Sequence, residues 1–276
     1  MPDRLAVSTN SYHSYSLEEA LAGIAGAGFT SVELSSVPGW TEHVLRDAPD
    51  AELDAVKQQV ADVGLDAISM SGHSDLASDE GMAAFRKALR IASRLEIPFV
   101  TTSTGGHDDS SAGSVEDQRR DFLTRFGPLA DEAGAAGINI CIETHGGLSS
   151  TGAKTAELIQ AIGKPNVGIN YDTANVIFYG GVRPEEDIEA AALYVNHLHL
   201  KDKAGGDQEW NFPAIGAGNV DFSVVFHALE AVGFTGPVSV ELEFQGEPWP
   251  PLEEVNAAMA ESHAFIRTHL PKADFT

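Results

Sequence analysis

Apolar residues along this chain follow two alternating spacings. Short runs rich in β-branched residues are followed repeatedly by longer stretches whose apolar residues lie three or four positions apart. The first pattern is typical of buried strands and the second of amphipathic helices. It predicts strands over residues 5–8, 31–34, 67–71, 99–102, 138–143, 167–171, 195–200 and 237–241. It predicts helices over residues 17–27, 50–63, 79–95, 115–136, 155–162, 184–192, 223–232 and 252–270.

Capping residues support several of these boundaries. Ser16 and Glu19 have the spacing of a capping box, which begins the first helix. Gly64 ends the second helix, and Pro184 is suited to the first turn of its own helix. Gly127-Pro128 predicts an interruption inside the helix over residues 115–136.

The strict order of strand and helix predicts the fold class. Parallel strands need helical crossovers, and eight such units in 276 residues favour a closed (β/α)8 TIM barrel of the α/β class. A doubly wound open sheet is the alternative, but no GxGxxG follows the first strand. No Pro/Ser-rich linker divides the chain, so we expect one domain over residues 1–276.

The net charge of the chain limits the kinds of partner that it can bind. Lys and Arg number 17 and Asp and Glu 41, which gives a net charge of −24. Such a chain repels phosphate backbones and anionic membrane surfaces, which argues against nucleic-acid and membrane binding. Cys141 is the only cysteine, and no apolar run reaches the ~20 residues that span a bilayer. We therefore expect a cytoplasmic protein, with assembly into a homo-oligomer left open.

Candidate chemistry lies where the predicted strands end. In (β/α)8 barrels the active site is built at the carboxyl ends of the strands. Polar residues at or just after those ends are Glu33, His73, His107, Glu143, His145, Asp172, Asn175, His197, His199, Lys201, Asp202, Glu241 and Glu243.

Strands five to eight each end in side chains that can bind a metal. Glu143, Asp172, His199 and Glu241 would converge on one point above the barrel. Three neighbouring carboxylates repel one another, and a divalent cation removes that repulsion. Carboxylates with one imidazole suit Mn²⁺, Mg²⁺ or Co²⁺, with Zn²⁺ as a further option. Side chains alternate along a strand, so His197 and His199 lie on the same face, as do Glu241 and Glu243. Spacing alone therefore leaves open which residue of each pair would bind the metal.

Four motifs resemble the sugar-phosphate isomerase/epimerase superfamily, the group of xylose isomerase-like, metal-dependent TIM barrels. They are Ile142-Glu143-Thr144-His145-Gly146-Gly147, Tyr171-Asp172-Thr173-Ala174-Asn175, His197-Leu198-His199-Leu200-Lys201-Asp202 and Ser239-Val240-Glu241. The resemblance implies one divalent ion, most often Mn²⁺, with Glu143, Asp172, His199 and Glu241 as its ligands. It also implies that Glu143 and Glu241 act as the acid/base pair.

The resemblance further implies an activity. We expect an isomerase or epimerase that acts on a ketose, a sugar acid or a related polyhydroxy carbonyl compound through an enediolate. Ketose 3-epimerases commonly carry His at the position of Asn175, and Glu-Ser-x-Arg where this chain has Lys201-Asp202-Lys203-Ala204. Inosose dehydratases have a similar HxHxKD segment, so a lyase is the alternative. A barrel that only binds a sugar or a partner is the rival from another class.

The remaining polar residues are interpreted as substrate contacts. The residues expected to face substrate are His73, His107, His145, Asn175 and Lys201. Glu33 is interpreted as facing substrate or supporting a ligand, rather than as a ligand itself. The expected partner is a small sugar or a polyol-derived molecule.

Overall fold

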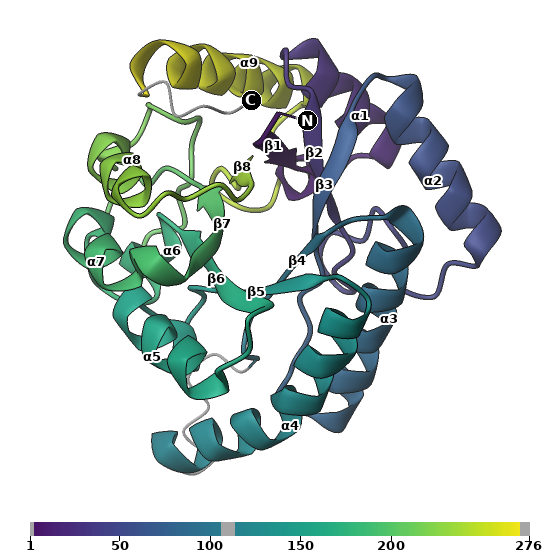
Figure 1. The fold of residues 1–276 in the computed structure, drawn as a ribbon. Helices are drawn as coiled ribbons and strands as arrows, with labels where there is room; N and C mark the ends of the chain where they lie inside the picture. Colours follow the sequence, from purple (N-terminus) through teal and green to yellow (C-terminus); the bar gives the residue numbers. More distant parts are fainter. Residues whose placement is uncertain (1–2, 106–113, 271–276) are drawn as a thin grey trace.

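The computed structural model describes residues 3–105 and 114–270. Eight parallel strands form a closed barrel in chain order, with β1 paired to β8, and the helices surround it (Figure 1). The predicted (β/α)8 fold is confirmed. The strands are β1 (Leu5–Ser8), β2 (Ser31–Ser35), β3 (Asp66–Ser71), β4 (Phe99–Thr102), β5 (Asn139–Glu143), β6 (Val167–Asp172), β7 (Val195–Leu200) and β8 (Val238–Val240).

The helices lie between the strands, as the sequence predicts. They are α1 (Leu17–Gly26), α2 (Asp50–Asp62), α3 (Asp79–Leu95), α4 (Val115–Ala135), α5 (Gly152–Ile162), α6 (Asn175–Phe178), α7 (Pro184–Ala191), α8 (Phe222–Ala231) and α9 (Leu252–His269). Short 3₁₀ segments are η1 (Thr9–Tyr12), η2 (Gly147–Ser149) and η3 (Ala192–Tyr194). The capping box of Ser16 and Glu19 is present. Helix α9 lies beside α1, so the last of the described helices packs against the first (Figure 1).

The structure corrects two helix predictions. Helix α4 is not interrupted at Pro128: it runs from Val115 to Ala135, with Phe126 and Leu129 buried on either side of the proline. The missing N–H of Pro128 removes one hydrogen bond, and the buried neighbours hold the helix across that gap. Helix α5 begins at Gly152, because Thr151 accepts a hydrogen bond from the backbone of Lys154 and so caps it.

Two irregularities in the barrel lie beside polar interior side chains. The pairing of β2 with β3 shifts between Val32 and Glu33, and that of β6 with β7 shifts between Ile169 and Asn170. Bulges of this kind re-aim a side chain and are common next to active sites. Glu33 and Asn170 both turn into the interior, where they meet the histidines of β7.

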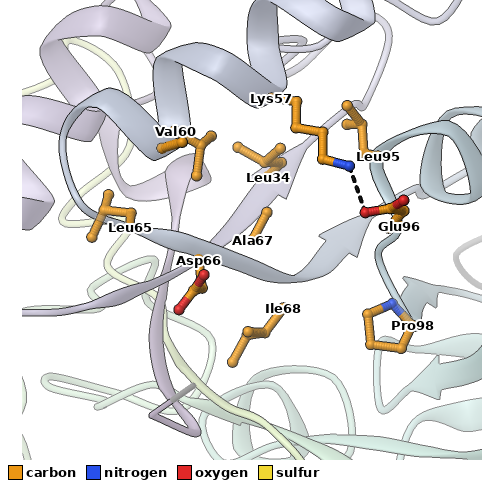
Figure 2. A pocket seen from close by; sticks show the side chains of 11 residues that line it. Leu34, Lys57, Val60, Leu65, Asp66, Ala67, Ile68, Leu95, Glu96 and Pro98 are labelled. Atoms are coloured by element: carbon orange, nitrogen blue, oxygen red, sulfur yellow. Dashed lines mark hydrogen bonds and ion pairs between the residues drawn. The ribbon is translucent and has the colours of Figure 1, made fainter. Parts of the chain in front are cut away.

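A separate cavity of about 370 Å³ lies outside the barrel. It lies over β3 between α2 and α3, and Leu34, Val60, Ile68 and Leu95 form much of its wall (Figure 2). Lys57 and Glu96 form an ion pair at its edge (Figure 2). This cavity is mainly apolar and shares no lining residue with the pocket described next.

Candidate active site

A pocket of about 520 Å³ opens where the strands end. Residues at or after the ends of all eight strands contribute to its wall. The polar and charged lining residues include Asn10, His73, Asp75, Glu143, His145, Lys201, Glu241 and Glu243. Trp40, Tyr179 and Trp210 add aromatic surface. The pocket thus combines a charged floor with aromatic walls.

Four of the predicted residues meet at the floor of this pocket. Glu143, Asp172, His199 and Glu241 each offer one ligand atom, and these atoms lie within 4.8 Å of one another. His199 Nδ1 is 3.3 Å from Glu143 Oε2, 3.7 Å from Glu241 Oε2 and 3.8 Å from Asp172 Oδ2. All four residues are buried.

The donor set of this cluster fits a divalent cation. Within the described residues, His199 Nδ1 and Asp172 Oδ2 are buried and make no hydrogen bond. Buried polar atoms are rarely left without a partner, and here both face the same small space among carboxylates. Three carboxylates and one imidazole match the ligands that a hard or borderline divalent ion prefers.

The electrostatics of the cluster point the same way. Burial raises the pKa of Asp172 to about 7; Lys201 opposes the shift, and the carboxylates of Glu143 and Glu241 add to it. Burial lowers the pKa of His199, but the surrounding carboxylates outweigh it and hold that pKa well above its usual range. Without a bound cation, the cluster therefore favours holding protons on its own side chains.

Glu33 fixes the orientation of His199 from below. The carboxylate oxygens of Glu33 lie 3.0 and 3.2 Å from His199 Nε2. Ser69 Oγ donates a hydrogen bond to Glu33 Oε2 at 3.1 Å. In the neutral imidazole that a cation would bind, the contact with Glu33 favours the proton on Nε2 and leaves Nδ1 facing the cluster. Glu33 is fully buried and is absent from the pocket wall, so it supports a candidate ligand.

His197 lies deeper in the barrel than His199. Its Nε2 is 3.1 Å from Glu33, and its Nδ1 is 2.8 Å from Asn170 Oδ1. Glu33, His197 and His199 form a second group with metal-ligand side chains. Their facing nitrogen and oxygen atoms already contact one another. Among the described residues, His197 Nε2 also makes no hydrogen bond, but this group has a single carboxylate, whereas the cluster above it has three.

Glu143, at the end of β5, is held by neutral donors. Asn170 Nδ2 donates to Oε2 and Asn175 Nδ2 to Oε1, each at 2.8 Å. His73 Nε2 lies 3.2 Å from Oε2. Burial raises the pKa of Glu143, but His199 and His73 outweigh it and hold that pKa well below its usual range.

Glu241, just after β8, has a charged surrounding. Asn10 Nδ2 donates to Oε1 at 3.1 Å, and Lys201 Nζ donates to Oε2 at 2.9 Å. Lys201 also lies 2.7 Å from Glu243, a second buried carboxylate. Burial lowers the pKa of Lys201, but the carboxylates of Glu241 and Glu243 hold it well above its usual range.

The predicted substrate contacts fall in different places. His73, His145 and Lys201 line the pocket, and the first two rings stack with centroids 5.5 Å apart. Asn175 is 2% exposed, does not line the pocket and bonds to Glu143, and its contact with substrate stays a prediction. His107 lies outside the described residues.

Sequence reasoning missed three residues of this site. Asn10 follows β1, and its position just after a strand end could have identified it. Asn170 lies two positions before Asp172 and therefore on the same strand face, so alternation could have identified it. Arg46 carried no sequence signal; its buried guanidinium donates to the carbonyl oxygens of Ser36 and His73 and so fixes the loop that bears His73.

A family model described as a xylose isomerase-like TIM barrel matches residues 21–269. The chain belongs to this family. An L-ribulose 3-epimerase from Mesorhizobium japonicum is 28% identical over 247 residues, which cover 82% of this chain and 75% of that protein. An inosose dehydratase from Geobacillus thermodenitrificans is 32% identical over 150 residues, 45% of each chain.

Solved structures support the same xylose isomerase-like fold. That of a D-psicose 3-epimerase in the presence of D-fructose aligns with a TM-score of 0.76 and 20% identity, covering 95% of this chain and 98% of the other. None of the described helices is long and apolar enough to cross a membrane.

Proposed function

We propose that this protein is a divalent-metal-dependent isomerase or epimerase that acts on a free ketose or a related polyhydroxy carbonyl compound. The observation that carries the proposal is a pair of buried glutamates, Glu143 and Glu241, on either side of one cluster at the floor of a pocket. The similarity to an L-ribulose 3-epimerase over most of the chain supports it.

Glu143, Asp172, His199 and Glu241 would hold the ion. Mn²⁺ suits three carboxylates and one imidazole best, with Mg²⁺, Co²⁺ and Zn²⁺ as alternatives. When bound, the ion would polarise a carbonyl and a neighbouring hydroxyl, which makes the intervening C–H more acidic. Glu33 would keep His199 in the tautomer that binds, through its contact with Nε2.

The two glutamates would move the proton. One carboxylate takes it from the carbon next to the carbonyl, which leaves an enediolate, and the other returns a proton to the opposite face. Because Asn170 and Asn175 hold both oxygens of Glu143, its carboxylate is fixed in direction before substrate arrives. His73, His145 and Lys201, which line the pocket, would bind the hydroxyl groups of the substrate.

The charge of the pocket favours an uncharged substrate. Its described lining residues include the carboxylates of Asp75, Glu143, Glu241 and Glu243 against the single ammonium of Lys201. A phosphate or carboxylate on the substrate would meet like charge there, whereas hydroxyl groups can donate to these oxygens. We therefore place free ketoses ahead of sugar acids and sugar phosphates.

A lyase of inosose-dehydratase type is the second candidate. Lys201 favours it, because its ammonium lies 2.9 Å from Glu241 and lines the pocket. Glu241 would remove the proton next to the carbonyl, and Lys201 would protonate the departing β-hydroxyl, which leaves as water and yields an unsaturated ketone. The inosose dehydratase among the relatives supports this reading.

One experiment separates the two candidates. Protein loaded with Mn²⁺ is incubated in D₂O with L-ribulose, D-psicose, D-fructose and an inosose, and the products are followed by NMR. An epimer with one deuterium next to the carbonyl supports the first proposal, and an unsaturated product supports the lyase. No exchange and no conversion of any of these compounds, with any of the four ions, would overturn both proposals.

Location in the cytoplasm and assembly into homo-oligomers remain predictions from the sequence.

A further inference from the structure

Glu243 is a buried carboxylate beside the cluster that the proposed chemistry does not use. It is 6% exposed and is outside the group of four candidate ligands. Asn10 Nδ2 donates to its Oε1 at 2.9 Å, and Lys201 Nζ lies 2.7 Å from its Oε2. The same amide and the same ammonium also donate to Glu241. We call Asn10, Lys201 and Glu243 the Glu241 clamp.

The amide of this clamp has a defined direction. Thr41 Oγ1 donates to Asn10 Oδ1 at 2.6 Å, so the Nδ2 group of Asn10 faces the two carboxylates. The hydroxyl of Thr41 lies in turn 2.7 Å from His13 Nδ1. Both Asn10 N–H bonds are therefore directed at Glu241 and Glu243, with no ambiguity between its nitrogen and oxygen.

The backbone that carries Glu243 is fixed as well. Glu243 and Phe244 both donate their N–H groups to the carbonyl oxygen of Phe212, at 3.2 and 2.9 Å. Phe244 adopts a φ of 51°, which is left-handed and unfavourable for a bulky residue. A conformation of that kind persists only where its surroundings enforce it, and it is commonest at functional sites.

The Glu241 clamp gives the Lys201 ammonium a second carboxylate contact besides Glu241. If Glu241 binds an ion and exchanges a proton, the charge of its carboxylate changes during the reaction. Glu241 alone would therefore not hold the ammonium in one place. Glu243 offers a second, shorter contact that takes no part in either task. The ring of Phe212 lies 4.6 Å from Nζ and bounds the ammonium on a further side.

We propose that Glu243 is a positioning residue, which with Asn10 holds the Lys201 ammonium beside Glu241 and facing the oxygen atoms of the substrate. The claim about the substrate rests on the function proposed above. The claim about position does not, because it concerns only where Nζ lies.

The test compares Glu243→Gln with Lys201→Met, their double variant and Glu230→Gln. Glu230 is an exposed residue of α8, so its variant makes the same charge change far from the pocket. Asn10 and Lys201 contact different oxygens of Glu243, and a Gln at 243 replaces one of those acceptors with an NH₂ donor, so it cannot keep both contacts in this geometry. We expect Glu243→Gln to lower kcat by ~10 to 100-fold with KM within about twofold of the wild type.

The double variant decides whether Glu243 acts through Lys201. We expect its kcat to fall no lower than that of Lys201→Met alone, since residues that act as one unit are not additive. If the losses in kcat of the two single variants multiply in the double variant, the two residues act independently and the proposal is overturned. A loss of metal affinity in Glu243→Gln by calorimetric titration would also overturn it, because Glu243 would then serve the ion instead. Should Glu243→Gln fail to fold, Glu243→Asp retains the charge one methylene further from Lys201 and should show the same loss of kcat.

A crystal structure of Glu243→Gln tests the position without any assay. We expect Lys201 Nζ to leave Glu241 in the variant and to stay there in Glu230→Gln. An unmoved Nζ would overturn the positioning role even if the enzyme is active. A displaced Nζ in a protein that converts no ketose would uphold that role and leave the proposed function as the part that failed.

Discussion

Glu143 and Glu241 are the same residue type at the ends of two strands of one barrel, yet the two sides of the site differ. Two amides from β6 and α6, together with one imidazole, surround Glu143. Glu241 has one amide, one ammonium and a neighbouring carboxylate. Two amides fix the direction of Glu143, and His199 and His73 hold its pKa low, whereas an ammonium lies beside Glu241 as a proton donor. The difference teaches that equivalent positions in a symmetric fold are made unequal by the residues next to them.

The largest expected effect comes from replacing either carboxylate. Glu143→Gln and Glu241→Gln each retain one oxygen and the shape of the side chain but cannot accept the proton. We expect turnover to fall by ~100 to 10,000-fold in each, the usual contribution of a positioned acid or base. Exchange of the substrate C–H with D₂O should separate the two sides, with each variant losing exchange from a different face.

Metal content is the control for these variants. Each should be assayed at saturating ion, with the bound ion measured by elemental analysis. Wild-type turnover in both fully loaded variants would contradict the acid/base roles and favour a barrel that only binds its ligand.

The supporting amides should have the next largest effect. Asn175→Ala removes one of two amides from Glu143, and Asn10→Ala removes the amide that Glu241 shares with Glu243. We expect each to lower kcat by ~10 to 100-fold, because residues that orient a ligand or base typically contribute that much. Steady-state kinetics measure it. A rise in KM alone for Asn175→Ala would restore the substrate contact that the sequence predicted for it.

Removal of the ion should affect both sides together, because it is shared. We expect chelation to leave the barrel folded, since a chain of this size buries a large apolar core. An ion at 100 times its Kd stabilises by about 2.7 kcal/mol, which is a shift in Tm of roughly 5 °C for a chain of this length. Thermal melts with and without chelator measure it, and loss of helical circular dichroism at room temperature would contradict it.

The smallest effect is a pH dependence of stability that comes from His43, outside both sides of the site. His43 lies in the loop after β2, and its Nε2 contacts the carbonyl oxygen of Tyr15 at 2.9 Å. Burial holds the pKa of His43 below its usual value. A depressed pKa means that the unfolded chain takes up this proton first, so folding stability falls as pH drops below about 6.5.

His43→Gln should remove that part of the acid sensitivity. Denaturant melts at pH 7.5 and 5.5 should show a smaller loss of unfolding free energy in the variant than in the wild type. Equal losses in the two proteins would show that His43 is charged without penalty in the folded state.

The fold could be predicted because its signal is periodic. Each strand is an apolar run and each helix has a buried stripe, so the order of elements and the ends of most of them follow from local spacing. The helix through Pro128 could not, because packing of Phe126 and Leu129 outweighed a local breaker. The short α6 was also missed, since it begins where Asp172 Oδ1 accepts from the backbone of Ala174 and Asn175.

The site was predictable only as far as strand ends determine it. Glu143, Asp172, His199 and Glu241 follow four consecutive strands, and parallel strands bring such residues to one edge. What each side chain contacts depends on register shifts, as at Asn170, and on loops that pack across the barrel, as with Arg46. Asn175 was assigned to the substrate and bonds to Glu143, because the backbone turn after β6 points its amide inward.

The closure of β1 against β8 has a consequence for synthesis of the chain. Asn10 and Glu241 are 231 residues apart in sequence and bond directly. A growing polypeptide on the ribosome therefore carries Glu143, Asp172 and His199 before Glu241 exists, and Asn10 has no Glu241 to orient until 231 further residues have been added. Contacts between such distant residues form late in folding. Activity should consequently switch on abruptly at barrel closure, so a prematurely terminated product that lacks β8 should be inert rather than partly active.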